Sequence, residues 1–187
     1  MIKSALETIA NELDEYLRLK FRVDNKRVVV SNIVNQDGSI AITDPNKIVL
    51  TLVSIQEEKV LPNSQFRLTG NGANPPVCLN LNVLVSAYFT ASLYPESLRF
   101  LSVVIGFFQN KNVFDSQSSP GLDSGIEKII FDIQNLSFNE QSNLWASLGA
   151  KYLPSILYRV RMVVIEESML SYDITSVSGL NTDLNGN

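Results

Sequence analysis

Apolar residues recur every three or four positions along the first part of the chain, and charged residues occupy positions between them. This spacing places the apolar side chains on one face of a helix. The pattern predicts an amphipathic helix over residues 2–19. Its apolar positions are Ile2, Leu6, Ile9, Leu13 and Leu17.

A cluster of cations surrounds the end of this helix, opposed locally only by Asp24. The cluster comprises Arg18, Lys20, Arg22, Lys26 and Arg27. We interpret these residues as cations at a helix C-terminus, where the helix dipole favours positive charge, and in a solvated turn. Nucleic-acid binding is the weaker interpretation, because only Phe21 interleaves the charges for base stacking.

From Lys26 onward the apolar period changes to two, which is typical of β-strands. Asp37-Gly38 is a strong turn signal. Both faces of a strand that starts at Lys47 are apolar, so we expect this strand to lie centrally in the sheet. The predicted strands cover residues 27–34, 40–43, 47–60, 77–89, 126–135 and 155–166.

The strand over residues 77–89 has the clearest alternation. Val83, Val85 and other apolar residues point to one face, whereas Asn80 and Asn82 point to the other. This alternation indicates an antiparallel sheet with one dry face and one wetter face.

Two further helices are predicted. Pro95 suits the first turn of one of them. Apolar residues cover most of the circumference of this helix, so we expect the sheet or a neighbouring subunit to enclose it almost completely. The other begins at Ser137, which fits a capping box with Glu140, and ends at Gly149. Trp145 in this helix is better explained as a core anchor than as a platform for a ligand.

A chain of 187 residues is long enough to build one hydrophobic core. We predict a single α+β domain over residues 1–170, with a mainly antiparallel sheet of about four to six strands flanked by three helices. Residues 61–76 and 115–125 are predicted loops. The polar residues 171–187 are expected to form a loose, flexible tail.

The composition excludes several kinds of chemistry. The chain contains no histidine and a single cysteine, Cys78. Ser-His-Asp and Cys-His catalysis, an internal disulfide and multi-thiolate metal sites are therefore excluded. Phosphate-binding and nucleophile-elbow motifs are missing as well. We expect no catalytic residue, no metal and no cofactor, and folding in an intracellular compartment.

Charge and hydropathy indicate which classes of partner the chain is not expected to bind. The chain has 19 acidic and 15 basic residues, and this net charge of −4 disfavours nucleic acid as a partner. Its longest strongly apolar stretch, residues 100–108, is far shorter than the roughly 20 residues that cross a bilayer. Glu7 and Glu12 interrupt any run that could serve as a signal peptide. We therefore expect a soluble protein with no membrane requirement.

Charged pairs near strand ends are the remaining candidates for chemistry. Glu57-Glu58 and Glu166-Glu167 are adjacent on strands, where neighbouring side chains point to opposite faces, so neither pair forms a carboxylate dyad by itself. Arg159 and Arg161 share a face and could clamp an anion, but a solvated or partner-facing strip is the better interpretation. An enzyme built from two distant acids is a weaker alternative.

Several blocks of the sequence resemble one known family. The most specific block runs from Asn143 to Met162, and weaker blocks cover Pro75–Tyr88, Tyr94–Leu101 and Val113–Phe114. Over roughly residues 3–170 the chain is similar to the cap, or tail-terminator, proteins of extracellular phage-tail-like contractile injection systems. These antifeeding-prophage-like caps were long catalogued as a domain of unknown function. The family pattern in the main block includes Trp145, Gly149, Tyr152, Pro154 and Tyr158.

The resemblance implies a tail-terminator-like fold and a structural subunit without catalysis. Members of the family form a ring, expected to be a homohexamer, that caps the inner tube and sheath at the end far from the baseplate. The implied partners are the terminal sheath and inner-tube subunits. The implied location is the cytoplasm during assembly, followed by incorporation into a contractile particle that can be released from the cell.

Two alternatives stay open at this point. Such systems can contain both a terminal cap and a cap adaptor beneath it, and the sequence does not assign the chain to either position. A small standalone ligand-binding or hydrolytic domain is the alternative from another class of protein.

A stack of identical rings propagates until a subunit blocks its last face, where sheath strands lack partners. We expect the tail or the 61–76 loop to supply the contact with tube or sheath. The candidate interface residues are Arg159, Arg161, Glu166 and Glu167.

Overall fold

The computed structural model describes residues 1–58 and 77–164. They form one six-stranded sheet with three α-helices and a short 3₁₀ helix, η2. The elements follow in the order α1 (Ile2–Phe21), β1 (Val28–Val30), β2 (Lys47–Glu57), β3 (Val77–Tyr88), η2 (Ala91–Leu93), α2 (Tyr94–Asn110), β4 (Val113–Asp115), β5 (Ile126–Ile133), α3 (Phe138–Ser147) and β6 (Ser155–Val164).

The strands lie in the order β1-β2-β3-β6-β5-β4. β1 runs parallel to β2, and every other neighbouring pair is antiparallel. The edge strands β1 and β4 have three residues each, whereas β3 in the middle has twelve. This arrangement confirms the α+β class and the mainly antiparallel sheet.

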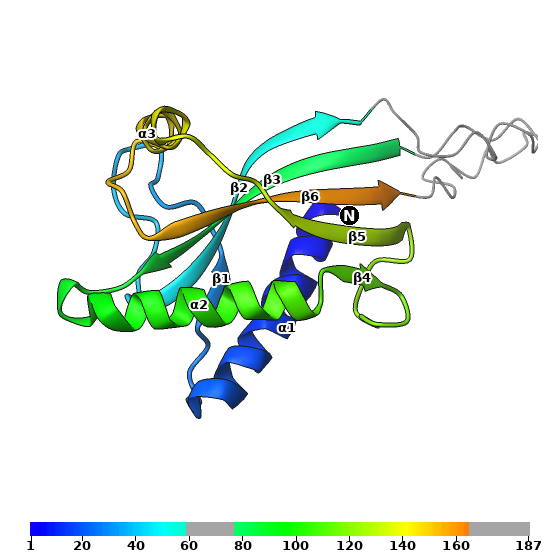
Figure 1. The fold of residues 1–187 in the computed structure, drawn as a ribbon, viewed down its shortest axis with the longest axis horizontal. Helices are drawn as coiled ribbons and strands as arrows, with labels where there is room; N and C mark the ends of the chain where they lie inside the picture. The colour runs from blue at the N-terminus through cyan, green and yellow to red at the C-terminus, as the bar shows by residue number, and fades with distance from the viewer. Residues whose placement is uncertain (59–76, 165–187) are drawn as a thin grey trace, which may run out of the picture.

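One face of the sheet packs against α1 and α2, which lie together beneath it in Figure 1. The apolar stripe predicted for the first helix is buried here, with Leu13 and Leu17 fully enclosed. Val83 and Val85 of β3 and Val160 of β6 contribute to the same core. Because each large apolar side chain contributes about 1.5–3 kcal/mol when fully buried, this layer is the main source of stability.

Among the described residues, α3 is the helix that covers the opposite face of the sheet, and it does so at one end (Figure 1). Trp145 packs there with Ile33, Leu84 and Leu157 in a second, smaller apolar cluster. The predicted dry face is confirmed. The predicted wetter face needs a correction, because it is dry where α3 crosses it and polar only over the rest.

The helix α3 begins as the capping pattern predicts. The Ser137 Oγ accepts a hydrogen bond from the Glu140 N–H at 3.3 Å, and the Ser137 N–H donates to the Glu140 carboxylate at 2.8 Å. Gly149, just beyond the helix, has a φ of +65°, which a residue without a Cβ adopts at little cost. The chain can therefore turn sharply and return to the sheet as β6.

A cluster of aromatic rings fills the main core between α2 and the sheet. Phe108 stacks on Phe131 with ring centroids 4.4 Å apart, and Tyr158 lies 4.8 Å from Phe108. The Tyr158 hydroxyl is buried and has no hydrogen-bond partner in the described part of the chain. Burial raises the pKa of this phenol, because the ionised form loses its hydration.

A buried carboxylate joins α1 to the edge of the sheet. Asp14 is 6% exposed, and its Oδ1 accepts hydrogen bonds from the N–H groups of Arg27 at 2.5 Å and Val28 at 2.8 Å. Arg22 ends α1 in the left-handed conformation, with φ at +54°. The chain thus reverses after α1 and enters β1 beside the helix.

The helix α2 is less enclosed than its sequence predicts. Phe100, Val104 and Phe108 face the core, but Leu98 is 43% exposed and Ile105 is 36% exposed. Within the described residues, the sheet and α1 cover one side of α2 only. That a neighbouring subunit covers the exposed side of α2 stays a prediction.

β2 extends well past the strand beside it. β1 pairs only with Ile48 to Leu50, whereas β2 continues to Glu57. Beyond Thr51, no described strand pairs with the outer edge of β2. The register shifts between Leu52 and Ser54, as in a β-bulge that bends an edge strand.

Three strand predictions need correction. The strand predicted for residues 27–34 is only β1, because the chain leaves the sheet to bury Ile33 under α3. Residues 40–43 form no strand, although a bridge between Val34 and Ile40 closes the predicted turn. The sequence analysis missed β4, which is too short for a recognisable pattern.

Some predictions fall outside the described residues. They concern the 61–76 loop, the 171–187 tail, and Glu166 and Glu167. The division into a 1–170 domain and a flexible tail stays a prediction.

We predict that Asp14→Ala lowers the free energy of unfolding by about 2–4 kcal/mol, because two backbone N–H groups lose their acceptor. Urea denaturation followed by circular dichroism measures this change. Glu15→Ala, an exposed position on the same helix, is the control and should stay within about 0.5 kcal/mol of wild type. Equal stabilities of the two variants would contradict this role of Asp14.

We predict that Tyr158→Phe raises the free energy of unfolding at pH 7 by about 1 kcal/mol, because it removes a buried hydroxyl without a partner. The raised pKa in the folded state means that wild type keeps its full stability below the usual tyrosine pKa of about 10 and loses stability as the pH rises above it. The variant lacks this alkaline loss. Denaturation at pH 7 and at about pH 10.5 measures both effects. A variant that is clearly less stable at pH 7 would show that the hydroxyl is hydrogen-bonded.

Candidate assembly surfaces

The described residues bring no metal-binding cluster together. Within residues 1–58 and 77–164, no three His, Cys, Asp or Glu side chains lie close enough to hold a metal ion. Four carboxyl groups have a lowered pKa, and the largest cause in each is a hydrogen bond in a turn or helix cap. They are Asp37 (bonded by Ser39), Asp115 (Ser118), Asp123 (Gly125) and Glu140 (Ser137).

The single cysteine and the helices also carry no special chemistry. Cys78 is buried, and this burial raises the pKa of its thiol and keeps it protonated. In the described part of the chain, none of the helices has the length and hydrophobicity to span a bilayer. The candidate functional features are therefore surfaces.

The first surface is the open part of the second sheet face, which we call the polar strip. It combines side chains from four neighbouring strands and from the residue after β2, because alternate residues of each strand point to this face. The strip consists of Ser54, Gln56, Glu58, Asn80, Asn82, Asp132, Arg159 and Arg161.

Both predicted interface arginines lie on the polar strip, but in different environments. The Arg161 Nε is 2.9 Å from the Glu58 Oε2, with the two side chains 35% and 24% exposed. Arg159 is exposed and lies opposite Asn82 on one side and Asp132 on the other. Glu58 already engages Arg161, so the two arginines do not form a free anion clamp. Arg159 is the one available to a partner.

The ion pair between Glu58 and Arg161 could not be predicted from the pattern of the sequence. These residues are 103 positions apart in the chain. They meet because β3 lies between β2 and β6: the Glu58 N–H donates to the Cys78 carbonyl at 2.8 Å, and Asn80 lies opposite Arg161. Only knowledge of the strand order could have predicted this contact.

The second surface surrounds α3 and the turn into β6. Trp145 is 4% exposed, whereas Tyr152 is 59% exposed and meets the Trp145 ring edge-to-face at 5.6 Å. The Pro154 carbonyl accepts a hydrogen bond from the Ala87 N–H at 2.9 Å. Trp145, Gly149, Tyr152 and Pro154 therefore lie together, while Tyr158 lies on the opposite sheet face in the main core.

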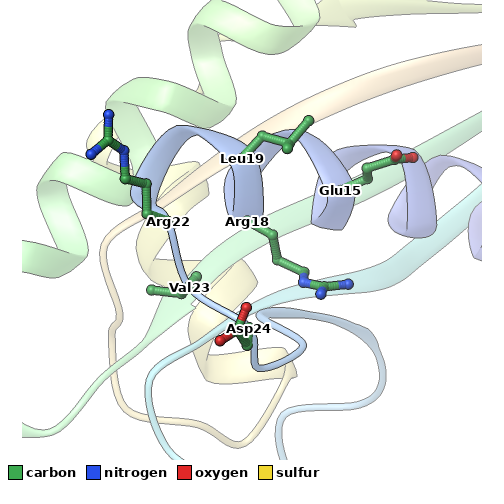
Figure 2. A pocket seen from close by; sticks show the side chains of 6 residues that line it. All are labelled: Glu15, Arg18, Leu19, Arg22, Val23 and Asp24. Atoms are coloured by element: carbon green, nitrogen blue, oxygen red, sulfur yellow. The ribbon is translucent and has the colours of Figure 1, made fainter.

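The third surface, which we call the basic corner, lies at the C-terminal end of α1. Glu15, Arg18, Leu19 and Arg22 of α1 border a shallow hollow with Val23 and Asp24 of the following turn (Figure 2). The Arg99 guanidinium of α2 lies 5.1 Å from the centre of the Phe21 ring. The basic corner comprises Arg18, Lys20, Arg22 and Arg99 at this end of α1. It also includes Lys26 and Arg27 of the following segment, which runs back along the helix, so that the Lys26 Nζ donates to the Asn11 Oδ1 at 3.3 Å.

Comparison with known proteins gives one family match. The sequence model of the family described as the Pvc16 N-terminal domain matches residues 4–172. Among curated proteins, no sequence is significantly similar to the chain.

Two solved structures are similar to the fold. One is the sheath/tube terminator of an extracellular contractile injection system, PVC, in the extended state, with a TM-score of 0.59 and 16% identity over 100% of this chain and 64% of that chain. The other is the anti-feeding prophage cap, a tube-terminating cap, with a TM-score of 0.54 and 18% identity over 93% of this chain and 59% of that chain. The chain thus spans about three fifths of the length of these relatives. At these identities the similarity shows the fold, and it confirms the prediction of a tail-terminator-like fold.

We predict that Glu58 and Arg161 are energetically coupled, whereas Glu58 and Arg159 are not. In a double-mutant cycle, Glu58→Gln and Arg161→Gln should give a coupling of about 0.5–1 kcal/mol, as expected for a partly exposed ion pair. Glu58→Gln with Arg159→Gln is the matched control and should be additive. Urea denaturation of the single and double variants measures both cycles, and equal couplings would contradict the observed pairing.

Proposed function

Because the chain belongs to the Pvc16 N-terminal domain family, we propose that it is a structural subunit of a contractile injection system. In this proposal it terminates the inner tube and the sheath at the end far from the baseplate. The observation that carries the proposal is the similarity of the whole chain to the PVC sheath/tube terminator. The anti-feeding prophage cap supports the same role.

The physical task of such a subunit is to end a polymer. A stack of identical rings grows through head-to-tail contacts, and each new ring presents the same free face as the last. A terminating subunit must bind that face and offer no equal face beyond it.

The sheet edges suit a subunit that joins a partner on one side. Beyond Thr51, the outer edge of β2 has backbone groups that no described strand satisfies. Such an edge can accept an extended segment from a partner as an added strand. The opposite edge of the sheet ends in the three-residue strand β4, which offers little to pair with.

Other exposed side chains of the body suit a protein partner as well. Ile55 on β2 is 49% exposed, and Leu98 and Ile105 on α2 add exposed apolar surface. Arg159 on the polar strip supplies an exposed charge without an ion-pair partner in the described part of the chain. Exposed apolar side chains and charges of this kind are typical of surfaces that recognise a protein.

The proposal includes a sixfold ring of identical subunits, contacts with the last sheath and tube subunits, and assembly in the cytoplasm. It includes no catalytic step, no metal and no cofactor. The solved relatives are a sheath/tube terminator and a tube-terminating cap. The proposal therefore covers both a terminal cap and an adaptor beneath it.

We predict that cells which produce the particle but lack this gene make tubes and sheaths of uncontrolled length. The missing subunit no longer blocks the last ring, so elongation continues. Restoring the wild-type gene should restore one length, which negative-stain electron microscopy measures on purified particles.

Arg159→Glu should restore the length only in part, because it reverses a charge at the proposed contact. Lys3→Glu, which carries the same change at an exposed position of α1 outside the candidate surfaces, is the matched control and should restore it fully. An unchanged length distribution without the gene would overturn the proposed function. Catalytic turnover by the purified chain would overturn it as well.

A further inference from the structure

The basic corner is a concentration of positive charge on an acidic protein. Residues 18–27 hold five cations and one carboxylate, a net charge of +4, while the whole chain has a net charge of −4. Arg18, Lys20, Arg22, Lys26 and Arg99 are all exposed. Like charges at this density repel one another, so the corner gains stability when an anionic partner binds.

The ion pairs of the described residues do not involve this corner, although two carboxylates, Glu15 and Asp24, line its hollow together with Arg18 and Arg22. The four ion pairs among residues 1–58 and 77–164 lie elsewhere: Met1 N-terminus with Asp123, Lys3 with Glu7, Lys111 with Glu12, and Arg161 with Glu58. Figure 2 shows Arg18 and Arg22 extending away from each other around the end of α1. They can contact an anionic segment that passes along the hollow between them.

Aromatic rings hold the corner together. Phe21 stacks on Phe100 with centroids 4.0 Å apart, and Arg99 lies over the Phe21 ring. The Arg27 guanidinium lies 6.0 Å from the centre of the Phe100 ring. Because these contacts join the end of α1 to α2, cations from both helices form one rigid surface.

The negative charge that matches this surface is at the other end of the sequence. Residues 165–187 contain Glu166, Glu167, Asp173 and Asp183 and no Lys or Arg, a net charge of −4. Residues 1–164 contain 15 acidic and 15 basic residues and are neutral overall. The whole net charge of the chain therefore lies in this last segment, and it equals the charge of residues 18–27 with the opposite sign.

The two charged regions start from opposite ends of α1. Val164, the last residue of β6, lies opposite Ile126, and the nearby Asp123 pairs with the Met1 amino group at 3.4 Å. Val164, the residue that precedes the acidic segment, therefore lies close to the N-terminus of α1. The basic corner is at the far end of this 20-residue helix, about 30 Å away.

We infer that residues 165–187 of one copy bind the basic corner of the next copy. Donor and acceptor sites at opposite ends of one body make a head-to-tail contact, which is the kind that closes into a ring. The segment is long enough for this, because 23 extended residues span up to roughly 75–80 Å. The inference rests on the proposed function, since a ring subunit needs such a contact.

Zero-length cross-linking of the full chain tests the inference. A carbodiimide joins a carboxylate to a lysine amine only when the two are in contact, and Lys20 and Lys26 are the amines of the basic corner. A mixture of unlabelled and ¹⁵N-labelled chains distinguishes links between copies from links within one copy. We expect mixed-isotope links from Lys20 or Lys26 to Glu166 or Glu167, both in the purified chain and in particles.

Charge-reversal variants test whether the cross-links depend on the charges of the basic corner. Arg18→Glu with Arg22→Glu should reduce these links at least tenfold while leaving the thermal unfolding curve unchanged. Lys3→Glu with Lys151→Glu makes the same change in net charge at exposed positions away from the corner and should leave the links intact. Adding Glu166→Lys and Glu167→Lys to the first variant should restore cross-linking, with the roles of amine and carboxylate exchanged.

Three results would overturn the inference. They are links found only within one copy, links unaffected by Arg18→Glu with Arg22→Glu, and a corner that binds a nucleic-acid oligonucleotide while the segment stays unlinked. If any of these occurs and wild-type chain still sets particle length, the proposed function stands. If wild-type chain does not set particle length, the proposed function fails, whatever the cross-links show.

Discussion

Burial of one sheet face against α1 and α2 is the interaction on which the rest of the structure depends. Alternate residues of β3 and β6 supply this face, and the three-to-four spacing of α1 supplies the surface that covers it. The stability of the body therefore comes from a single apolar layer. The second face and the sheet edges are not needed to bury this apolar layer, so their side chains can vary to suit a partner.

The second sheet face, the two sheet edges and the ends of α1 differ from one another. This difference suits a subunit of an ordered assembly. α3 covers one end of the second face through Trp145 and leaves the polar strip open. The long strand β2 has an unpaired outer edge among the described residues, whereas the other sheet edge is short. Positive charge is concentrated at one end of α1. A body with unlike ends can join its neighbours in one orientation only, which is what a closed ring requires.

The sequence predicted the parts of the fold that local geometry controls. The period of α1, the alternation of β3 and the capping box at Ser137 depend on residues close together in the chain. The length of β1 was wrong because Ile33 leaves the sheet to pack under Trp145, which is more than a hundred residues away in the chain.

Contacts between residues far apart in the chain also decide the candidate surfaces, and the sequence does not show these contacts. A period of two places Arg159 and Arg161 on one face, as the sequence indicates. Only the strand order shows that Glu58 pairs with Arg161 and leaves Arg159 free. The exposure of Leu98 and Ile105 was not predicted either. Apolar residues around a helix show that other elements can cover it, but they do not show that such elements are present.

The position of α1 also affects how the chain folds as it is made. Leu13 and Leu17 leave the ribosome early, but Tyr158 and Val160, which complete their core, come about 140 residues later. At typical translation rates this delay is on the order of ten seconds. During that time the apolar stripe of α1 has no complete sheet to cover it. Slow translation therefore lengthens the period in which this apolar stripe is exposed on the nascent chain.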